Sequence, residues 1–177
     1  MSTLLKNIVR FILLIIVQVY VLDKITLHAM ITPYIYLLFI IWMPFKLSKI
    51  WQMIIAGLLG FALDSFRHSP GFHASACVMI AYIRPFLINI LIPQEGADTN
   101  YEEPSVKSMG GFFPYLVYAG ILTLIHHSCL FLLEAWQFSN FWYFIVKTFL
   151  STIITILLII ITELLFSRNQ QFNTNTV

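Results

Sequence analysis

Charged side chains are scarce in this sequence. Lys and Arg number ten and Asp and Glu eight among 177 residues, together 10% of the chain. A soluble domain of this length needs far more polar surface to cover its core. The formal net charge of +2 is also small, and its carriers are dispersed along the chain, which excludes a nucleic-acid-binding surface.

Cysteine is scarce as well, and the common catalytic motifs are missing. The two cysteines, Cys77 and Cys129, lie inside apolar stretches, where no structural disulfide is expected. The sequence has no Gly-rich phosphate loop, no His-Glu-x-x-His, no Gly-x-Ser-x-Gly and no Cys-x-x-Cys. We therefore predict a protein that is not an enzyme and that has no catalytic residues, cofactor or metal.

The sequence is rich in long apolar stretches. Hydrophobic residues make up 59% of the chain, and the mean hydropathy is +0.86. A bilayer core about 30 Å thick needs about 20 helical residues per crossing. The predicted transmembrane helices are Ile8–Leu22, Leu27–Phe45, Ile50–Leu63, Phe72–Ile92, Phe112–Ala135 and Phe141–Phe166. The predicted fold is one all-α polytopic bundle of about six helices over residues 1–168, followed by a disordered polar tail over residues 169–177.

The distribution of basic residues predicts the orientation of this bundle. If the N-terminus is cytoplasmic, six Lys and Arg residues fall in inner loops and only Lys24 and Arg67 fall in outer loops. The positive-inside rule therefore places both termini in the cytoplasm. The first helix is expected to remain uncleaved, because Asp23 and Lys24 follow it instead of a small-residue cleavage site. The longest inner connection, Gln94–Gly111, is expected to be flexible.

Two further predictions concern side chains near the ends of the spans. Glu134, near the outer end of the fifth span, and Lys147, about two turns into the sixth, are expected to pair across a short outer loop. An interfacial aromatic belt is expected from the four tryptophans Trp42, Trp51, Trp136 and Trp142.

Arg84 lies about a dozen residues into the fourth span, where a charge costs on the order of 2.5–3.5 kcal/mol. It shares a helical stripe with His73 and Cys77, which is expected to face other helices. In one interpretation Arg84 snorkels to the inner leaflet and fixes topology. In the other, which we adopt as a hypothesis, it makes a planar bidentate contact with a carboxylate or lipid phosphate. Asp64 is a poor partner because it lies towards the opposite face, and Pro85 is expected to loosen the helix.

His126 and His127 are adjacent in the fifth span. Adjacent helical residues point about 100° apart, so both cannot bind one ion, and no third ligand is in register. His127 instead shares a stripe with Thr123 and Glu134. We predict no metal site, although a small membrane enzyme acting on a lipid remains an alternative that these histidines and Glu134 leave open.

Four short motifs point to a known family. They are Leu-Leu-Gly-x-x-x-Asp ending at Asp64, the stretch Ser69-Pro70-Gly71-Phe72-His73-Ala74, the stretch Ile83-Arg84-Pro85-Phe86, and the stretch from His126 to Glu134. These motifs resemble those of the rod shape-determining protein MreD family of bacterial inner-membrane proteins, and the resemblance covers most of the chain. The family's usual Pro-Leu-Gly turn is Ser-Pro-Gly-Phe here, so its outer-turn contacts need not transfer.

This resemblance implies a non-catalytic subunit of the cell-elongation (rod) complex in the bacterial inner membrane. Such a subunit supports cell-shape maintenance and peptidoglycan synthesis as a scaffold. The implied partners are MreC, the peptidoglycan polymerase and transpeptidase, the actin-like filament system and membrane lipids. Candidate partner-interface or structural residues are Asp64, Pro70, Gly71, His73, Arg84, Pro85, His127, Glu134 and Lys147.

The alternative function is that of a substrate-binding subunit of an energy-coupling-factor type vitamin transporter, because the family resembles those subunits in fold. Fold similarity alone does not transfer function. Such a subunit requires an outward-opening pocket closed by loops. The predicted outer loops, around Asp23–Thr26, Ser65–Pro70 and Gln137–Asn140, are expected to be too short to form that lid.

Overall fold

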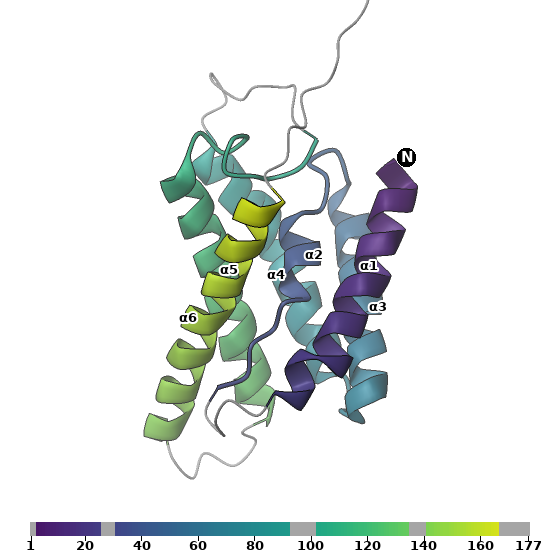
Figure 1. Cartoon of the computed structure of the whole chain (residues 1–177), viewed down its shortest axis with the longest axis vertical. Coiled ribbons are helices and arrows are strands. Elements are labelled where there is room, and N and C mark those ends of the chain that lie inside the picture. Colours follow the sequence, from purple (N-terminus) through teal and green to yellow (C-terminus); the bar gives the residue numbers. More distant parts are fainter. Residues whose placement is uncertain (1–2, 26–30, 93–101, 135–140, 167–177) are drawn as a thin grey trace, which may run out of the picture.

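The computed structural model describes residues 3–25, 31–92, 102–134 and 141–166. Figure 1 shows its long helices packed side by side as a bundle. The elements are α1 (Thr3–Tyr20), η1 (Leu22–Lys24), α2 (Leu37–Ile41), α3 (Lys49–Arg67), α4 (Phe72–Leu91), α5 (Phe112–Glu134) and α6 (Phe141–Leu165). The predicted tail over residues 169–177 and the first half of the Gln94–Gly111 connection lie outside the described residues.

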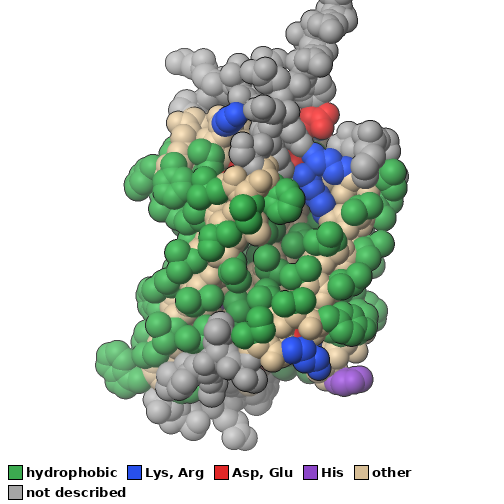
Figure 2. Space-filling model, in the orientation of Figure 1, with side chains coloured by type: hydrophobic (Ala, Val, Ile, Leu, Met, Phe, Trp, Pro, Cys, Tyr) green, Lys and Arg blue, Asp and Glu red, His purple; other side chains and the backbone are tan. Residues whose placement is uncertain are grey.

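Five of the helices are long and apolar enough to cross a membrane. Large apolar side chains point outward from them, including Ile90 at 76% exposure and Leu165 at 75%. Figure 2 shows that such side chains cover the waist of the molecule, while the visible charged groups gather at its two ends. Hydrocarbon, unlike water, solvates such a surface without cost. The protein is therefore a multi-pass helical membrane protein, as the hydropathy predicted.

The two ends of the bundle are formed by different parts of the chain. The start of α1, the end of α6 and residues 102–111 lie together at one end, which we call the terminal face (Figure 1). The other end, the hairpin face, contains η1, the turn of residues 68–71 and the end of α5. Five long helices and one irregular crossing therefore bring the start of α1 and the end of α6 to the same side.

The irregular crossing corrects the second predicted span, Leu27–Phe45, which is not a regular helix. Residues 31–36 are not helical, and α2 is only five residues long. This central segment, residues 31–43, still runs from the hairpin face towards the terminal face (Figure 1). Pro33 lacks a backbone donor and disfavours helix at the residue before it. Residues 33–43 are all buried, so their hydropathy reflects the interior of a bundle instead of contact with lipid.

Side chains of neighbouring helices supply the hydrogen bonds that this segment lacks. The bonds are Thr32 N to Ser151 Oγ (3.1 Å), Tyr34 N to Thr155 Oγ1 (3.2 Å), Ile35 N to Gln18 Oε1 (2.9 Å) and Gln18 Nε2 to Pro33 O (3.1 Å). Irregular backbone is tolerated at membrane depth when protein groups satisfy it in this way. The hydroxyls of α6 and the amide of Gln18 therefore hold the central segment in place.

Replacing Gln18 by Leu is expected to lower the thermal stability of the purified protein. The change leaves the Ile35 amide and the Pro33 carbonyl unpaired in a buried site, at about 1–3 kcal/mol for each group. Thermal unfolding in detergent measures the loss. The matched control is Ile16→Leu, on the exposed face of the same helix. Equal melting temperatures for the two variants would contradict the assigned role of Gln18.

The first predicted span begins five residues earlier than expected, at Thr3 instead of Ile8, and the fourth, fifth and sixth agree with the observed helices to within one residue. The third was expected to be short, but α3 has 19 residues and places Asp64 inside its last turns instead of at its end. The chain also stays helical through Pro85, which lies within α4.

Two residue groups at the terminal face differ from the sequence-based expectation. The second half of the long connection is packed, because buried Glu103 binds Arg10 Nη1 at 2.8 Å and Lys6 Nζ at 3.2 Å. Trp42 is not an interfacial anchor: it is 7% exposed, and its Nε1 lies 3.1 Å from Glu163 Oε2. The two exposed tryptophans, Trp51 and Trp142, lie at the starts of α3 and α6, while Trp136 is outside the described residues.

Candidate site at the hairpin face

The hairpin of α3 and α4 is closed by Asp64. Its Oδ1 accepts from His73 N at 3.0 Å and its Oδ2 from Ala74 N at 2.9 Å, and Ser69 Oγ donates to the same carboxylate. The two amides lie in the first turn of α4, where no helical acceptor exists for them. A carboxylate at this position also interacts favourably with the helix dipole. Asp64 of α3 is therefore the N-terminal cap of α4.

Gly71 makes this tight turn possible. It lies just before α4 with a φ of 86°, in the left-handed region that glycine adopts without steric cost. Pro70, next to it, is exposed. The sequence-predicted residues Asp64, Pro70, Gly71 and His73 are thus brought together around one turn.

Arg67 connects this turn to η1, which follows α1. Its Nε lies 2.9 Å from Asp23 Oδ2, and its Nη2 pairs with the other oxygen of the same carboxylate. Its Nη1 lies 3.2 Å from both Tyr34 Oη and His73 Nε2. Because a guanidinium can only donate, His73 Nε2 accepts, and its Nδ1–H donates to Asp64 Oδ1 at 2.9 Å. His73 is therefore held as the neutral Nδ1–H tautomer.

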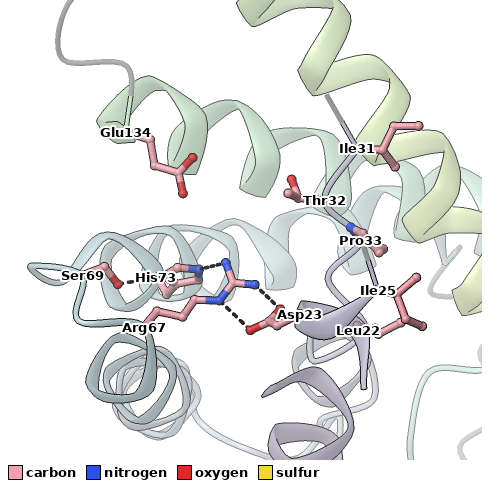
Figure 3. A pocket seen from close by; sticks show the side chains of 10 residues that line it. All are labelled: Leu22, Asp23, Ile25, Ile31, Thr32, Pro33, Arg67, Ser69, His73 and Glu134. Atoms are coloured by element: carbon pink, nitrogen blue, oxygen red, sulfur yellow. Dashed lines mark hydrogen bonds and ion pairs between the residues drawn. The ribbon is translucent and has the colours of Figure 1, made fainter. Parts of the chain in front are cut away.

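These polar residues form one wall of a cavity of about 720 Å³ that opens at the hairpin face. The cavity is lined by Leu22, Asp23, Ile25, Ile31, Thr32, Pro33, Arg67, Ser69, His73 and Glu134. In Figure 3 the carboxylate of Glu134 lies across the gap from the pair of Arg67 and His73, and Thr32 and Ile31 lie to the right of it. The volume lies within the range of about 300–1,000 Å³ that is typical of small-molecule sites.

Glu134 on the far wall makes the ion pair that the sequence predicted. Lys147 Nζ lies 3.1 Å from Glu134 Oε2, and the same ammonium lies 4.2 Å from the centre of the Phe131 ring. The pair ties the end of α5 to α6 beside the cavity. Because Lys147 contacts only one carboxylate oxygen, Glu134 retains acceptor capacity on the cavity side.

The two adjacent histidines of α5 are both fully buried and face different neighbours. His126 Nε2 lies 2.9 Å from Tyr36 Oη. His127 Nδ1 donates to Thr123 O at 2.8 Å, and its Nε2 lies 3.2 Å from Thr155 Oγ1. Within the described part of the chain, no three His, Cys, Asp or Glu residues come close enough to hold a metal ion.

Arg84 lies apart from this site, and both interpretations of it were wrong. It is 0% exposed, so it reaches neither the inner leaflet nor a lipid phosphate. Its Nε donates to Tyr118 Oη at 2.8 Å, its Nη1 to Gln52 Oε1 at 2.8 Å, and its Nη2 to Met43 O. These partners are neutral dipoles on three other elements, and none is a carboxylate. The predicted stripe of His73, Cys77 and Arg84 does face other helices, as all three residues are buried.

Sequence reasoning missed the partners of the buried Arg84 and of the partly exposed Arg67. Gln52 and Tyr118 were polar residues within apolar spans, and this is the signal that could have identified them. Tyr34, a partner of Arg67, could not be placed, because the segment between α1 and α3 was expected to be a helix.

The comparisons with known proteins identify no family: no family model, curated protein or solved structure matches the chain. The function must therefore be argued from the site and the sequence motifs. The cavity combines two carboxylates, a guanidinium, an imidazole and hydroxyls with an apolar wall. Such a combination is suited to holding a ligand or a partner by burial and a few oriented hydrogen bonds.

Proposed function

We propose that the protein is a non-catalytic scaffold subunit of the rod complex, in the bacterial inner membrane with the terminal face in the cytoplasm. The observation that carries the proposal is how the residues of the MreD-like motifs are used. Asp64 caps α4, Gly71 forms the turn, and Arg84 joins α4 to three other elements. These residues fix the turn and the positions of the helices relative to one another, as a scaffold requires.

The outer surface supports the same proposal. The helices present large apolar side chains outward, while the buried polar groups are mostly bonded to one another inside the bundle. Partner helices can pack on such a surface through van der Waals contact and close approach of backbones. By resemblance, the partners would be MreC, the polymerase and transpeptidase pair, and the actin-like filament system on the cytoplasmic side.

Depletion in the source cell tests this function directly. Cells that lose the protein should become round, and its purification in mild detergent should recover cell-wall synthesis proteins by mass spectrometry. Rod-shaped depleted cells that have lost uptake of one vitamin would contradict the proposal.

The proposed orientation makes a separate prediction. In a background with Cys77 and Cys129 replaced by Ala, Pro70→Cys at the hairpin face should react with an impermeant thiol reagent added outside the cell. Lys107→Cys at the terminal face should not react, since the positive-inside rule places it in the cytoplasm. Both positions are exposed. Reversed labelling would show that the orientation is opposite to the proposed one.

A second candidate function is a substrate-binding subunit of an energy-coupling-factor type transporter, and the cavity at the hairpin face favours it. The outer loops were expected to be too short to form a pocket lid. A cavity of about 720 Å³ is nevertheless present among the described residues, at the face that the orientation places outside. Residues 26–30 and 135–140 of those loops lie outside the described ranges.

Glu134→Gln separates the two candidates. For a scaffold, the variant should restore rod shape in depleted cells as well as the matched control Glu102→Gln, a carboxylate change at the other face. For a transporter subunit, Glu134→Gln should instead lower vitamin uptake, because it removes the charged acceptor on the cavity wall. Uptake of labelled vitamins and small-molecule analysis of the purified protein provide the measurements. If a vitamin is recovered with the purified protein in stoichiometric amount and is lost in Glu134→Gln, the protein is a transporter subunit and the scaffold proposal is wrong.

A further inference from the structure

The cavity at the hairpin face has a polar end and an apolar end. Figure 3 shows Glu134 and Ser69 at one end and three apolar side chains at the other, those of Ile25, Ile31 and Pro33. All five residues line the same cavity of about 720 Å³. A molecule that fills this space must therefore be amphipathic, with its polar group at the Glu134 end and an apolar body at the other.

The strong donors of the cavity wall are already used within the wall. A guanidinium carries five N–H groups, and Arg67 directs two of them to the carboxylate of Asp23. The two N–H groups of its Nη1 go to Tyr34 Oη and His73 Nε2, each at 3.2 Å. The Nδ1–H of His73 donates to Asp64 at 2.9 Å. Arg67 therefore has one N–H left for a ligand, too few for the paired contact that a carboxylate or phosphate makes.

The acceptors of the wall, by contrast, have capacity left. Among the described residues, the donor to Glu134 is Lys147, which binds Oε2, so Oε1 can accept from the cavity. Ser69 Oγ gives its hydrogen to Asp64 and keeps its lone pairs. The hydroxyl of Thr32, which also lines the cavity, can act as donor or acceptor. The wall thus favours a ligand that brings hydrogen-bond donors.

Lys147 offsets the charge of Glu134 from outside the cavity. Its ammonium lies 4.2 Å from the centre of the Phe131 ring, and Lys147 is not among the described residues that line the cavity. The ligand is therefore selected by its hydrogen-bond donors and not by a net charge of the wall. A carboxylate oxygen accepts more strongly from a charged donor than from a neutral one. A protonated amine is the donor that best matches Glu134 Oε1.

We propose that the cavity binds a small organic molecule with a protonated amine at one end of an apolar body. The ammonium donates to Glu134 Oε1, and the body packs against Ile25, Ile31 and Pro33. The cavity volume is that of a small-molecule site. This site is additional to the proposed scaffold function and does not depend on it. If the protein is a transporter subunit, the inference names the class of its substrate.

Three probes with the same hydrocarbon body test the site on the full-length protein in neutral detergent. They are cyclohexylmethylamine, cyclohexylmethanol and cyclohexanecarboxylate, and equilibrium dialysis against protein-free micelles measures their binding. The amine should bind about tenfold more tightly than the alcohol, because a hydrogen bond to a charged donor is stronger, and the carboxylate should not bind. Glu134→Gln should weaken binding of the amine about tenfold for the same reason. Glu102→Gln, a carboxylate change at the terminal face, is the matched control and should leave binding unchanged.

Lys147→Gln supplies a second variant, since a gain in binding cannot result from misfolding. It should tighten binding of the amine, because it removes a competing cation and frees the second oxygen of Glu134. Equal binding of the three probes, full binding of the amine in Glu134→Gln, or unchanged binding in Lys147→Gln would overturn the proposal.

The same ammonium chemistry is present on a lysine side chain of a partner protein. Nα-acetyl-lysine methylamide is the probe for that source, and it should bind more weakly than cyclohexylmethylamine. Tighter binding of the lysine derivative would overturn the small-molecule site. None of these results bears on cell shape, which is measured by depletion, so failure of the site and failure of the scaffold function are distinguishable.

Discussion

Gly60→Ala is expected to separate α3 from α4 and to leave little folded protein. A Cβ at residue 60 would lie 2.6 Å from the carbonyl carbon of His73 and closer still to the backbone of Ala74. Backbone cannot move aside as a side chain can, so the helices must part. Parting them also breaks the hydrogen bonds that amides in the first turn of α4 donate to Asp64. Overpacking and the lost cap together cost on the order of 3 kcal/mol or more.

Gly57→Ala is the matched control on the same helix. A Cβ there would meet Val78 Cγ2 at 3.2 Å, a side-chain atom that can shift by a few tenths of an ångström. The measurement is the yield of monodisperse protein in detergent and its melting temperature. Gly57→Ala should resemble the unaltered protein, while Gly60→Ala should fall well below it. Similar yields and stabilities for the two variants would refute the close approach at residue 60.

Arg84→Lys is expected to destabilise the protein strongly although it preserves the charge. The guanidinium donates to Tyr118, Gln52 and Met43 along three directions from one plane. The Lys ammonium is a single point on a flexible stem and cannot reproduce that fork. An incompletely compensated buried charge costs about 3–5 kcal/mol.

Arg10→Lys is the control for Arg84→Lys. Arg10 pairs with the carboxylate of Glu103 at the terminal face, where its side chain is 17% exposed, and Lys can keep an ion pair there. Thermal unfolding and the amount of each variant in the membrane give the comparison, with cell shape measured at matched levels. Unaltered stability in Arg84→Lys would mean that the three hydrogen bonds contribute little to the fold.

Hydropathy located the five long helices because each is apolar enough to span a bilayer, whatever its partners. The same signal failed for the central segment, whose residues are apolar because protein surrounds them. A buried irregular segment and a lipid-facing helix have the same mean hydropathy. Pro33 was the local sign that the helix could not continue, and the polar partner Gln18 was the distant one.

The contacts of the candidate site were also predicted only in part. Glu134 and Lys147 were paired correctly, because a short connection between consecutive helices leaves few alternatives. Arg84 was assigned the wrong class of partner, because Gln52 and Tyr118 belong to helices whose relative rotation the sequence does not specify. The cavity was missed for a similar reason, since its walls come from four separate stretches of chain.

The bonds that hold the central segment also impose an order on the biosynthesis of the protein. Thr32 and Tyr34 find their acceptors on α6, 119 and 121 residues later in the chain. At about 5–20 residues per second, the ribosome needs roughly 6–24 s to make that length. Throughout this interval the amides of the segment must be bonded by water, by the insertion machinery or by temporary neighbours. The second crossing to be synthesised is thus among the last to reach its final hydrogen bonding.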